Sequence, residues 1–192
     1  MIISHSNKWI YFAAPKAASS VIQMILQDYD EQDIEVDNHI TYSDLKKVLY
    51  KQNIDIDNYF KFTFVRNPWD KIVSFYHYAR ENGDIGSGVT FSWFVHNLDL
   101  WLWPGCCYIS MISEGEENKM DYIGRVETLR QDVCQVCDLL NIQKPRPWKT
   151  KTRANKSTHD HYSSYYDDDL KNIVADRYND EIEMFGYKFL ST

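Results

Sequence analysis

The fold is decided by residues 9–26, which read WIYFAAPKAASSVIQMIL. The first six residues form an apolar run that ends at Pro15, which is typical of a buried strand. After a turn of small and hydroxyl residues, apolar side chains recur at helical spacing from Val21 to Leu26. The stretch therefore predicts a strand, a tight loop and a helix, an arrangement that presents backbone N–H groups to a phosphate.

A second strand and helix follow the first. The alternating phenylalanines of residues 60–65 predict a strand, and Asn67-Pro68 predicts a helix start because asparagine suits the N-cap and proline the first helical position. Arg66 thus stands at the end of a strand, where the binding crevice of an open α/β sheet is lined. Ser74 follows Asn67 by about two helical turns, so both residues can share one helix face.

The rest of the chain alternates strands and helices. Helical spacing predicts helices at residues 43–50, 91–102, 129–140 and 170–182, with Gly186 ending the last one, and Tyr122–Val126 is predicted as a third strand. Residues 81–90 carry three glycines and are expected to form a loop. We therefore expect one α/β domain over residues 1–192, built as a three-layer sandwich in which helices cover both faces of a central parallel sheet.

The composition is that of an ordinary globular domain, and the net charge is −7. That charge argues against a general nucleic-acid binder, which is usually basic. Residues 144–156 are the exception to the acidic balance, because they carry six lysines and arginines and no acid. A solvated surface is the ordinary reading of such a run, but a protein that handles anions needs local positive potential of this kind.

No apolar run approaches the roughly 20 residues of a membrane span. The first residues, Met1-Ile2-Ile3, lead directly into a strand-like segment and do not form a signal peptide. We therefore expect a cytoplasmic protein with no membrane partner. Whether the chain is part of a longer protein stays open.

The four cysteines do not form a disulfide framework in a chain of this size. Cys106 and Cys107 are neighbours and pair poorly with each other, whereas Cys134 and Cys137 fall in a helical pattern. A redox or zinc role is possible for the second pair, but two half-buried helix cysteines are the favoured interpretation. No metal-binding motif is present, and we expect no metal.

The loop at residues 15–20 has the composition of an anion site. Its small residues allow backbone N–H groups to approach an anion closely, Lys16 adds a positive charge, and two serines add hydroxyl donors. The loop is not a Walker A sequence, because no G-x-x-x-x-G-K-S/T pattern is present and the lysine precedes the hydroxyls by three residues.

Together, the loop and residues 64–76 resemble the sulfotransferases that use 3′-phosphoadenosine-5′-phosphosulfate (PAPS), most closely the carbohydrate 2-O-type and Golgi-type enzymes. In that family the P-K-x-x-S/T-S/T loop holds the 5′-phosphosulfate, and the arginine and serine of R-N-P-x-x-x-x-x-S hold the 3′-phosphate. The resemblance implies donor contacts from Pro15, Lys16, Ala17, Ala18, Ser19, Ser20, Arg66 and Ser74. The loop departs from the family pattern in having two alanines where a glycine is usual.

Later segments agree with the family in their order along the chain. Residues 122–129, YIGRVETL, look like its G-R-x-E-x-L segment, and Phe185-Gly186-Tyr187 looks like its terminal F-G-Y. Residues 151–157 match the late loop that closes over the donor nucleotide, which implies a phosphate contact from Arg153 or a neighbouring lysine. The resemblance covers nearly the whole chain and implies a P-loop NTPase-like sulfotransferase fold.

Sulfuryl transfer needs a base that deprotonates the acceptor hydroxyl and a charge that stabilises the leaving phosphate. Lys16 fits the second role. For the first, His39 stands in NHITYSDL, which is similar to the segment H-I/V-S/T-x-x-E/D-L/F, whose histidine is the base in the 2-O-type branch. Glu35 and Asp37 are weaker rivals.

The other histidines and the tryptophans have less definite roles. His77 is expected to be structural, while His159 and His161 could touch donor or acceptor. The acceptor cleft could be lined by aromatic residues, with core packing as the alternative for two of them; these are Trp93, Phe94, Trp101 and Trp103.

The leading hypothesis is an enzyme that moves the sulfuryl group of PAPS to a hydroxyl of a small molecule or glycan, in particular a carbohydrate, and releases PAP. An ATP-dependent kinase on a P-loop-like scaffold is one alternative, which the missing Walker A loop and magnesium carboxylate disfavour. A non-catalytic nucleotide-binding protein is another, which the presence of both His39 and Lys16 disfavours. The acceptor's identity and the oligomeric state are not predicted.

Overall fold

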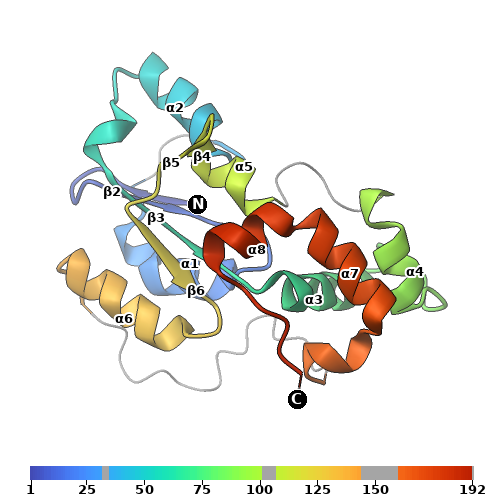
Figure 1. The fold of residues 1–192 in the computed structure, drawn as a ribbon. Coiled ribbons are helices and arrows are strands. Elements are labelled where there is room, and N and C mark those ends of the chain that lie inside the picture. The colour runs from blue at the N-terminus through green and yellow to red at the C-terminus, as the bar shows by residue number, and fades with distance from the viewer. Residues whose placement is uncertain (32–34, 101–106, 144–159, 192) are drawn as a thin grey trace.

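The structure, a computed structural model, describes residues 1–31, 35–100, 107–143 and 160–191 (Figure 1). Its central sheet has the strand order β1-β2-β3-β6, formed by Ile2–Ser4, Trp9–Phe12, Phe60–Val65 and Tyr122–Arg125. Strands β2, β3 and β6 are parallel, which confirms the predicted α/β class and a central sheet built around parallel strands.

The first strand departs from the predicted parallel sheet, because β1 pairs with β2 in the antiparallel direction. Only residues 5–8 separate the two strands, and Lys8 adopts the left-handed conformation (φ 57°) in that turn. So short a connection can form a hairpin but not the long crossover that a parallel pair requires.

Helices lie on both faces of the sheet (Figure 1). On one face, the ring of Trp9 lies 6.1 Å from that of Tyr29, in the 3-10 turn Gln27–Tyr29 after helix α1. On the other, the ring of Phe12 lies 6.3 Å from that of Tyr42, at the start of helix α2. The helices of this core are α1 (Ser19–Leu26), α2 (Tyr42–Lys51), α5 (Tyr108–Ile112) and α6 (Leu129–Leu139).

A second hydrophobic cluster lies beside the sheet and is formed by helices (Figure 1). Its centre is made of fully or almost fully buried side chains such as Ile72, Phe94 and Val174. The cluster is built from α3 (Pro68–Glu81), α4 (Phe91–His96), the 3-10 turn Tyr162–Tyr165, α7 (Asp168–Arg177) and α8 (Asn179–Phe185). The molecule therefore has a sheet-centred core and a helical core, and α8 contributes to both, because Phe185 is buried in the first and Ile182 packs against the second.

The ends of the helices follow from local hydrogen bonds. Asn67 caps α3, because its side chain accepts from the backbone N–H groups of Trp69 and Asp70, and Pro68 takes the first helical position, both as predicted. Gly186 ends α8 in the left-handed conformation, with φ 65°, which is also as predicted.

Two helix predictions were too long. The expected helix over 91–102 ends at His96, where the Asn97 side chain donates to the Trp93 carbonyl oxygen and competes with the backbone; 3-10 turn Leu98–Leu100 follows. The expected last helix is divided into α7 and α8 at Tyr178, which leaves helical geometry (φ −112°, ψ 24°).

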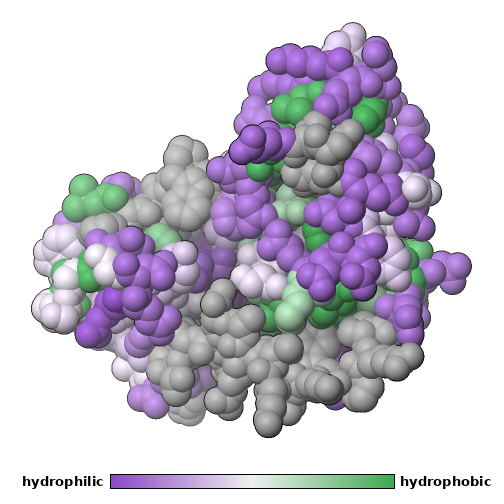
Figure 2. Space-filling view, turned by 180° about the vertical axis from the view of Figure 1, so that it is seen from behind, coloured by the Kyte–Doolittle hydropathy of each residue, from purple (hydrophilic) through white to green (hydrophobic). Residues whose placement is uncertain are grey.

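The small elements were not predicted, because they are too short to show periodicity. They are α5, the 3-10 turn Ile56–Asn58, and the hairpin of β4 (Ser113–Glu114) and β5 (Glu117–Asn118). Among the described helices, none has the length and apolar character that crossing a membrane would require. On the face seen in Figure 2, the described residues are mostly hydrophilic, and the apolar ones form small groups instead of one continuous patch.

Candidate functional site

Three connections lie at one edge of the sheet. Because β2, β3 and β6 are parallel, their carboxyl ends share an edge, and the chain leaves them through residues 13–18, 66–67 and 126–128. The first two connections carry residues predicted to bind the donor, and the third carries the middle of the predicted G-R-x-E-x-L segment, including Glu127. The fold thus gathers the sequence motifs at one place.

The loop after β2 has an unusual backbone. Lys16 (φ 58°) and Ala18 (φ 60°) both adopt the left-handed conformation, which glycine favours and which strains other residues. Ala18 is the N-cap of α1 and offers no side-chain cap to the first N–H groups of that helix. The loop therefore holds the conformation of a glycine-bearing anion loop although it has no glycine, and it leads into a helix start suited to an anion.

Three carbonyl oxygens of the loop each accept a hydrogen bond from the side chain of a different element. The pairs are Ala13 with His39 (2.6 Å), Pro15 with Tyr108 (2.9 Å) and Lys16 with Arg66 (3.4 Å). These donors come from the segment before α2, from α5 and from the end of β3. The loop is consequently held from three sides.

Lys16 points toward helix α3. Its Nζ lies 3.8 Å from the centre of the Tyr78 ring, a cation–π contact, and Tyr78 is 40% exposed. Burial and the neighbouring charge of Arg66 lower the pKa of Lys16 to about 8, against a smaller opposing effect of Glu81. The side chain is therefore still mostly charged at neutral pH and loses its charge only slightly above it.

Ser74 lies on the face of α3 that Lys16 approaches. Ser74, Tyr78 and Glu81 are spaced by four and three residues, and such residues line one face of a helix. Ser74 is buried, at 7% exposure. The structure thus brings Lys16 and Ser74, which the sequence places 58 residues apart, to the same side of α3.

Arg66 connects the loop to α3. Its Nε donates to a carboxylate oxygen of Asp70 at 2.7 Å, one turn into the helix, and its Nη1 donates to the Lys16 carbonyl oxygen. Both partners of the Arg66–Asp70 ion pair are largely buried. The guanidinium group is thereby fixed at the sheet edge, as a phosphate-binding arginine would have to be.

His39 contacts the end of β2. Its Nδ1 lies 2.6 Å from the carbonyl oxygen of Ala13, and because a carbonyl can only accept, Nδ1 carries the proton. In the neutral imidazole, Nε2 is then the nitrogen with the basic lone pair. The rival Asp37 is exposed and accepts the backbone N–H of His39 at 2.6 Å, while Glu35 is exposed as well. Of these three candidates, His39 has the orientation and tautomer of a base beside the loop.

The remaining predicted residues lie in the helical core, at the surface or in the undescribed segments. His77 contacts the Tyr165 hydroxyl at 2.9 Å, and Phe94 is fully buried, so both belong to the helical core. Trp93 is 44% exposed on α4, and His161 contacts Ser163 at the surface. Four named residues lie outside the described residues, together with the basic stretch: Trp101, Trp103, Arg153 and His159.

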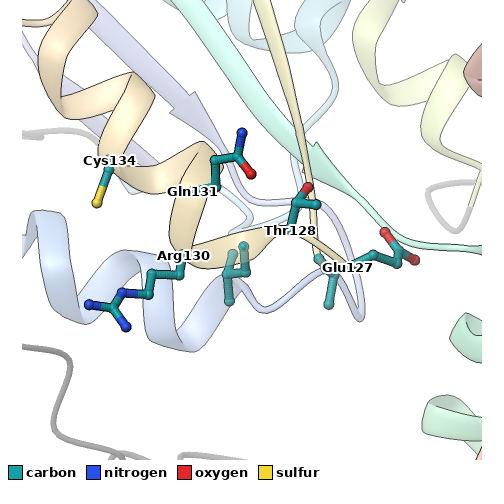
Figure 3. Close-up of a pocket in the computed structure, with 7 residues that line it drawn as sticks. Glu127, Thr128, Arg130, Gln131 and Cys134 are labelled. Atoms are coloured by element: carbon teal, nitrogen blue, oxygen red, sulfur yellow. The ribbon is translucent and has the colours of Figure 1, made fainter.

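A pocket of about 710 Å³ opens beside the end of β6 (Figure 3). It is lined by Val126, Glu127, Thr128, Leu129, Arg130, Gln131 and Cys134. In Figure 3 the Glu127 side chain extends to the opposite side from Arg130 and Cys134. The Glu127 carboxylate accepts from the Asn67 backbone N–H (2.7 Å) and the Tyr187 hydroxyl (3.2 Å). Glu127 therefore anchors the connection that carries Arg66. The pocket lies at the same edge of the sheet, directly after β6.

The cysteines on α6 agree with the favoured structural interpretation. Cys137 is fully buried in the sheet-centred core, and Cys134 is half-buried at the pocket. Within the described ranges, no group of three or more His, Cys, Asp or Glu side chains is arranged to hold a metal ion.

Residues 1–188 match the family model that is described as the sulfotransferase family. The chain belongs to this family. A protein of Archaeoglobus fulgidus, described as an uncharacterized protein, is 29% identical to the chain over 108 residues, which cover 55% of this chain and 84% of that protein. No solved structure matches the chain.

Membership of the sulfotransferase family supports an enzyme that transfers sulfate and confirms the family-level resemblance found in the sequence. It does not distinguish the carbohydrate 2-O-type branch from others, so that assignment stays a prediction. The site also contains residues that the sequence did not indicate. Tyr78 could have been found, because it follows Ser74 by one helical turn. Tyr108 could not, because no motif surrounds it.

Proposed function

We propose that this protein transfers the sulfuryl group of PAPS to a hydroxyl of a carbohydrate acceptor and releases PAP. The observation that carries the proposal is the contact between His39 Nδ1 and the Ala13 carbonyl oxygen. It joins the predicted base to the loop that bears the predicted leaving-group lysine. A base and a cation on opposite sides of one reacting group are what in-line transfer needs.

In the proposed reaction the acceptor oxygen attacks sulfur as Nε2 of His39 takes the hydroxyl proton. The bond between sulfur and the bridging oxygen of the 5′-phosphate breaks, and the electron pair stays on that phosphate oxygen. Lys16 and the backbone N–H groups of the loop stabilise the charge that develops there. The three loop carbonyls that accept hydrogen bonds from surrounding side chains support this role, since the contacts hold the backbone in one conformation.

The 3′-phosphate of the donor is assigned to Arg66 and Ser74, and the 5′-phosphosulfate to residues 15–20. The fixed guanidinium group of Arg66 and the position of Ser74 on the α3 face that Lys16 approaches support this division. Arg153, outside the described residues, remains a proposed third phosphate contact.

The first test compares thermal unfolding of the protein with PAP, with ATP and in buffer alone. Of the two nucleotides, we expect only PAP to raise the melting temperature, because a ligand that binds only the folded state stabilises it, and does so more at a given concentration the tighter it binds. A larger shift with ATP than with PAP would favour a kinase and overturn the proposal.

The second test replaces Lys16 by alanine. PAP binding and PAP release in the presence of PAPS and polysaccharide acceptors should both fall sharply, because the charge beside the phosphate is lost. Lys8→Ala is the matched control, because Lys8 also has a positive φ (57°) and lies over a tyrosine ring, that of Tyr59, but precedes β2 instead of following it. Equal losses in the two variants would show that the effect is not specific to the donor loop.

The third test separates the base from the donor site. His39→Ala should keep PAP binding and lose turnover by about 10²–10⁴-fold, the range for removal of a general base. His96→Ala is the control, since His96 likewise places Nδ1 on a backbone carbonyl oxygen, that of Ser92 at 2.9 Å, but lies exposed on α4. Full turnover in His39→Ala would show that another group is the base, even if PAP still binds.

A further inference from the structure

A buried ion pair lies behind the donor site. Lys71 Nζ is 2.7 Å from a carboxylate oxygen of Glu181, and the two side chains are 4% and 1% exposed. The Lys71 ammonium group also lies between two tyrosine rings, 4.0 Å from the centre of Tyr108 and 3.9 Å from that of Tyr178. These residues join α3, α5 and α8 around one buried ion pair.

Tyr108 connects this ion pair to the donor loop. Its backbone N–H donates to the other carboxylate oxygen of Glu181 at 2.6 Å, and its hydroxyl donates to the Pro15 carbonyl oxygen at 2.9 Å. The side chain is fully buried, and this burial raises the pKa of Tyr108 well above its ordinary value. The hydroxyl therefore remains a hydrogen-bond donor throughout the pH range in which the protein would work.

The network joins the two parts of the proposed donor site through the interior of the protein. Lys71 lies on α3 between Arg66 and Ser74, while Pro15 immediately precedes Lys16. A continuous chain of contacts leads from α3 through Lys71, Glu181 and Tyr108 to the carbonyl of Pro15. Buried ion pairs add little net stability because of their desolvation cost, whereas a fully bonded network fixes the geometry of the groups that it joins.

We propose that Tyr108 is a positioning residue that sets the Lys16 loop against α3 through its hydroxyl bond to Pro15. The expected effect on donor binding rests on the proposed function. The positioning of the loop by Tyr108 can be tested without any donor. The Tyr108 side chain acts through the backbone of Pro15 and is not assigned a contact with the substrate.

The test uses Tyr108→Phe, which removes the hydroxyl and keeps both the ring over Lys71 and the backbone N–H to Glu181. The first readout is competitive acylation of Lys16 as a function of pH in the folded protein without ligand. Loosening the loop exposes Lys16 to water, so its pKa should rise from about 8 toward the ordinary 10.5, and its reactivity at pH 8 should fall. The second readout is the dissociation constant of PAP, which should increase by up to about tenfold, because binding must then order a loop that the lost hydrogen bond no longer holds.

Tyr76→Phe is the matched control. The Tyr76 hydroxyl also donates to a backbone carbonyl oxygen, that of Val89 at 2.8 Å, and the residue is 5% exposed, but this bond does not reach the donor loop. A purely structural role would lower the melting temperature of both variants and leave Lys16 reactivity as in the wild type. We expect only Tyr108→Phe to change that reactivity and the PAP affinity.

Unchanged Lys16 reactivity in Tyr108→Phe would overturn the positioning role, whatever the protein binds. A wild-type protein that does not bind PAP would instead overturn the proposed function. In that case, altered Lys16 reactivity in the variant would still support the structural link.

Discussion

At the scale of single residues, the charge of Lys16 is the most sensitive property of the site. The side chain is half-buried beside Arg66 and above the Tyr78 ring, and its pKa is lowered to about 8. Burial and the arginine disfavour the ammonium form, while a bound phosphate would favour it. Without a bound phosphate, Lys16 is therefore mostly charged only below about pH 8.

PAP affinity should consequently depend on pH in the range around 8. Because only the ammonium form attracts the phosphate, the dissociation constant of PAP should rise as pH increases from 7 to 9, a range in which the phosphates of PAP are already almost fully ionised. Calorimetric titration at several pH values measures this change. In Lys16→Ala the affinity should be weaker and almost independent of pH over the same range; an equal slope in both proteins would exclude Lys16 as the titrating group.

The sequence could indicate residues of this site only where they stand in motifs. Lys16, His39, Arg66 and Ser74 were named from patterns along the chain, and the structure brings His39 and Arg66 into contact with the loop that carries Lys16. Tyr108 contacts that loop from 93 residues away, a distance over which the sequence holds no periodic signal. Its role depends on tertiary packing alone.

At the scale of elements, the start of α3 determines where Arg66 lies. Asn67 accepts hydrogen bonds from two N–H groups of the first turn, and its own side chain donates to the Lys188 carbonyl oxygen at 3.1 Å. Its backbone N–H is held by Glu127. One residue thus fixes the helix, the C-terminal segment and the connection that carries Arg66.

Asn67→Ala should therefore affect stability and donor binding together. Loss of an N-cap typically costs about 1–2 kcal/mol, measurable by urea denaturation. PAP affinity should also fall, because Arg66 is no longer held in place. Thr90→Ala, which removes the N-cap bond to Trp93 at the start of α4, should lower stability and leave PAP affinity unchanged. Equal PAP affinity in the two variants would show that the cap does not position Arg66.

The sheet itself depends on a close contact between β3 and β6. A Cβ atom added to Gly124 would lie 2.5 Å from the ring of Phe64, closer than any real contact. Gly124→Ala should therefore lower the free energy of unfolding by about 1–3 kcal/mol, the usual cost of overpacking. Gly88→Ala is the control, because nothing lies within 4 Å of the added atom, and a stability equal to that control would mean that the Phe64 ring moves aside at little cost.

Elements with a long periodic pattern were predictable, and short ones were not. The strands around Phe12, Phe64 and Gly124 and the helices α2, α3 and α6 fall close to their predicted ranges. The five-residue α5 and the two-residue strands β4 and β5 give no pattern that could separate them from loops. The division at Tyr178 was missed because apolar spacing continues through it from α7 into α8.

At the scale of the whole molecule, the pair Lys71–Glu181 joins the sheet-centred core to the helical core. Lys71 lies on α3 of the helical core, Glu181 lies on α8, which contributes to both cores, and Tyr108, whose N–H donates to Glu181, belongs to the core around the sheet. The charges are buried where the two cores meet. Their separation would leave an unpaired charge in an apolar environment, so the two cores are expected to unfold together.

Removal of one partner should be costly. Glu181→Ala should lower the free energy of unfolding by about 3–5 kcal/mol, because it leaves the Lys71 ammonium buried without a counter-charge. Glu181→Gln, which keeps an oxygen acceptor, should lower the free energy of unfolding by less. It therefore serves as a variant that stays folded for comparison. Asp99→Ala, which breaks the exposed pair with Arg177, should have little effect on the free energy of unfolding in the same urea denaturation. An equally small effect of Glu181→Ala would contradict the view that the buried Lys71–Glu181 pair holds the two cores together.

The antiparallel pairing of β1 has a practical consequence for protein production. Because Ile2 pairs with Tyr11, the chain begins near the carboxyl end of β2, and the amino group of Met1 donates to the carbonyl oxygen of Asn38, the neighbour of His39, at 3.2 Å. Any affinity tag or fusion partner attached before Met1 would emerge beside the proposed base and the donor loop. Enzymatic assays are therefore best carried out on protein to which no tag or fusion partner has been added before Met1.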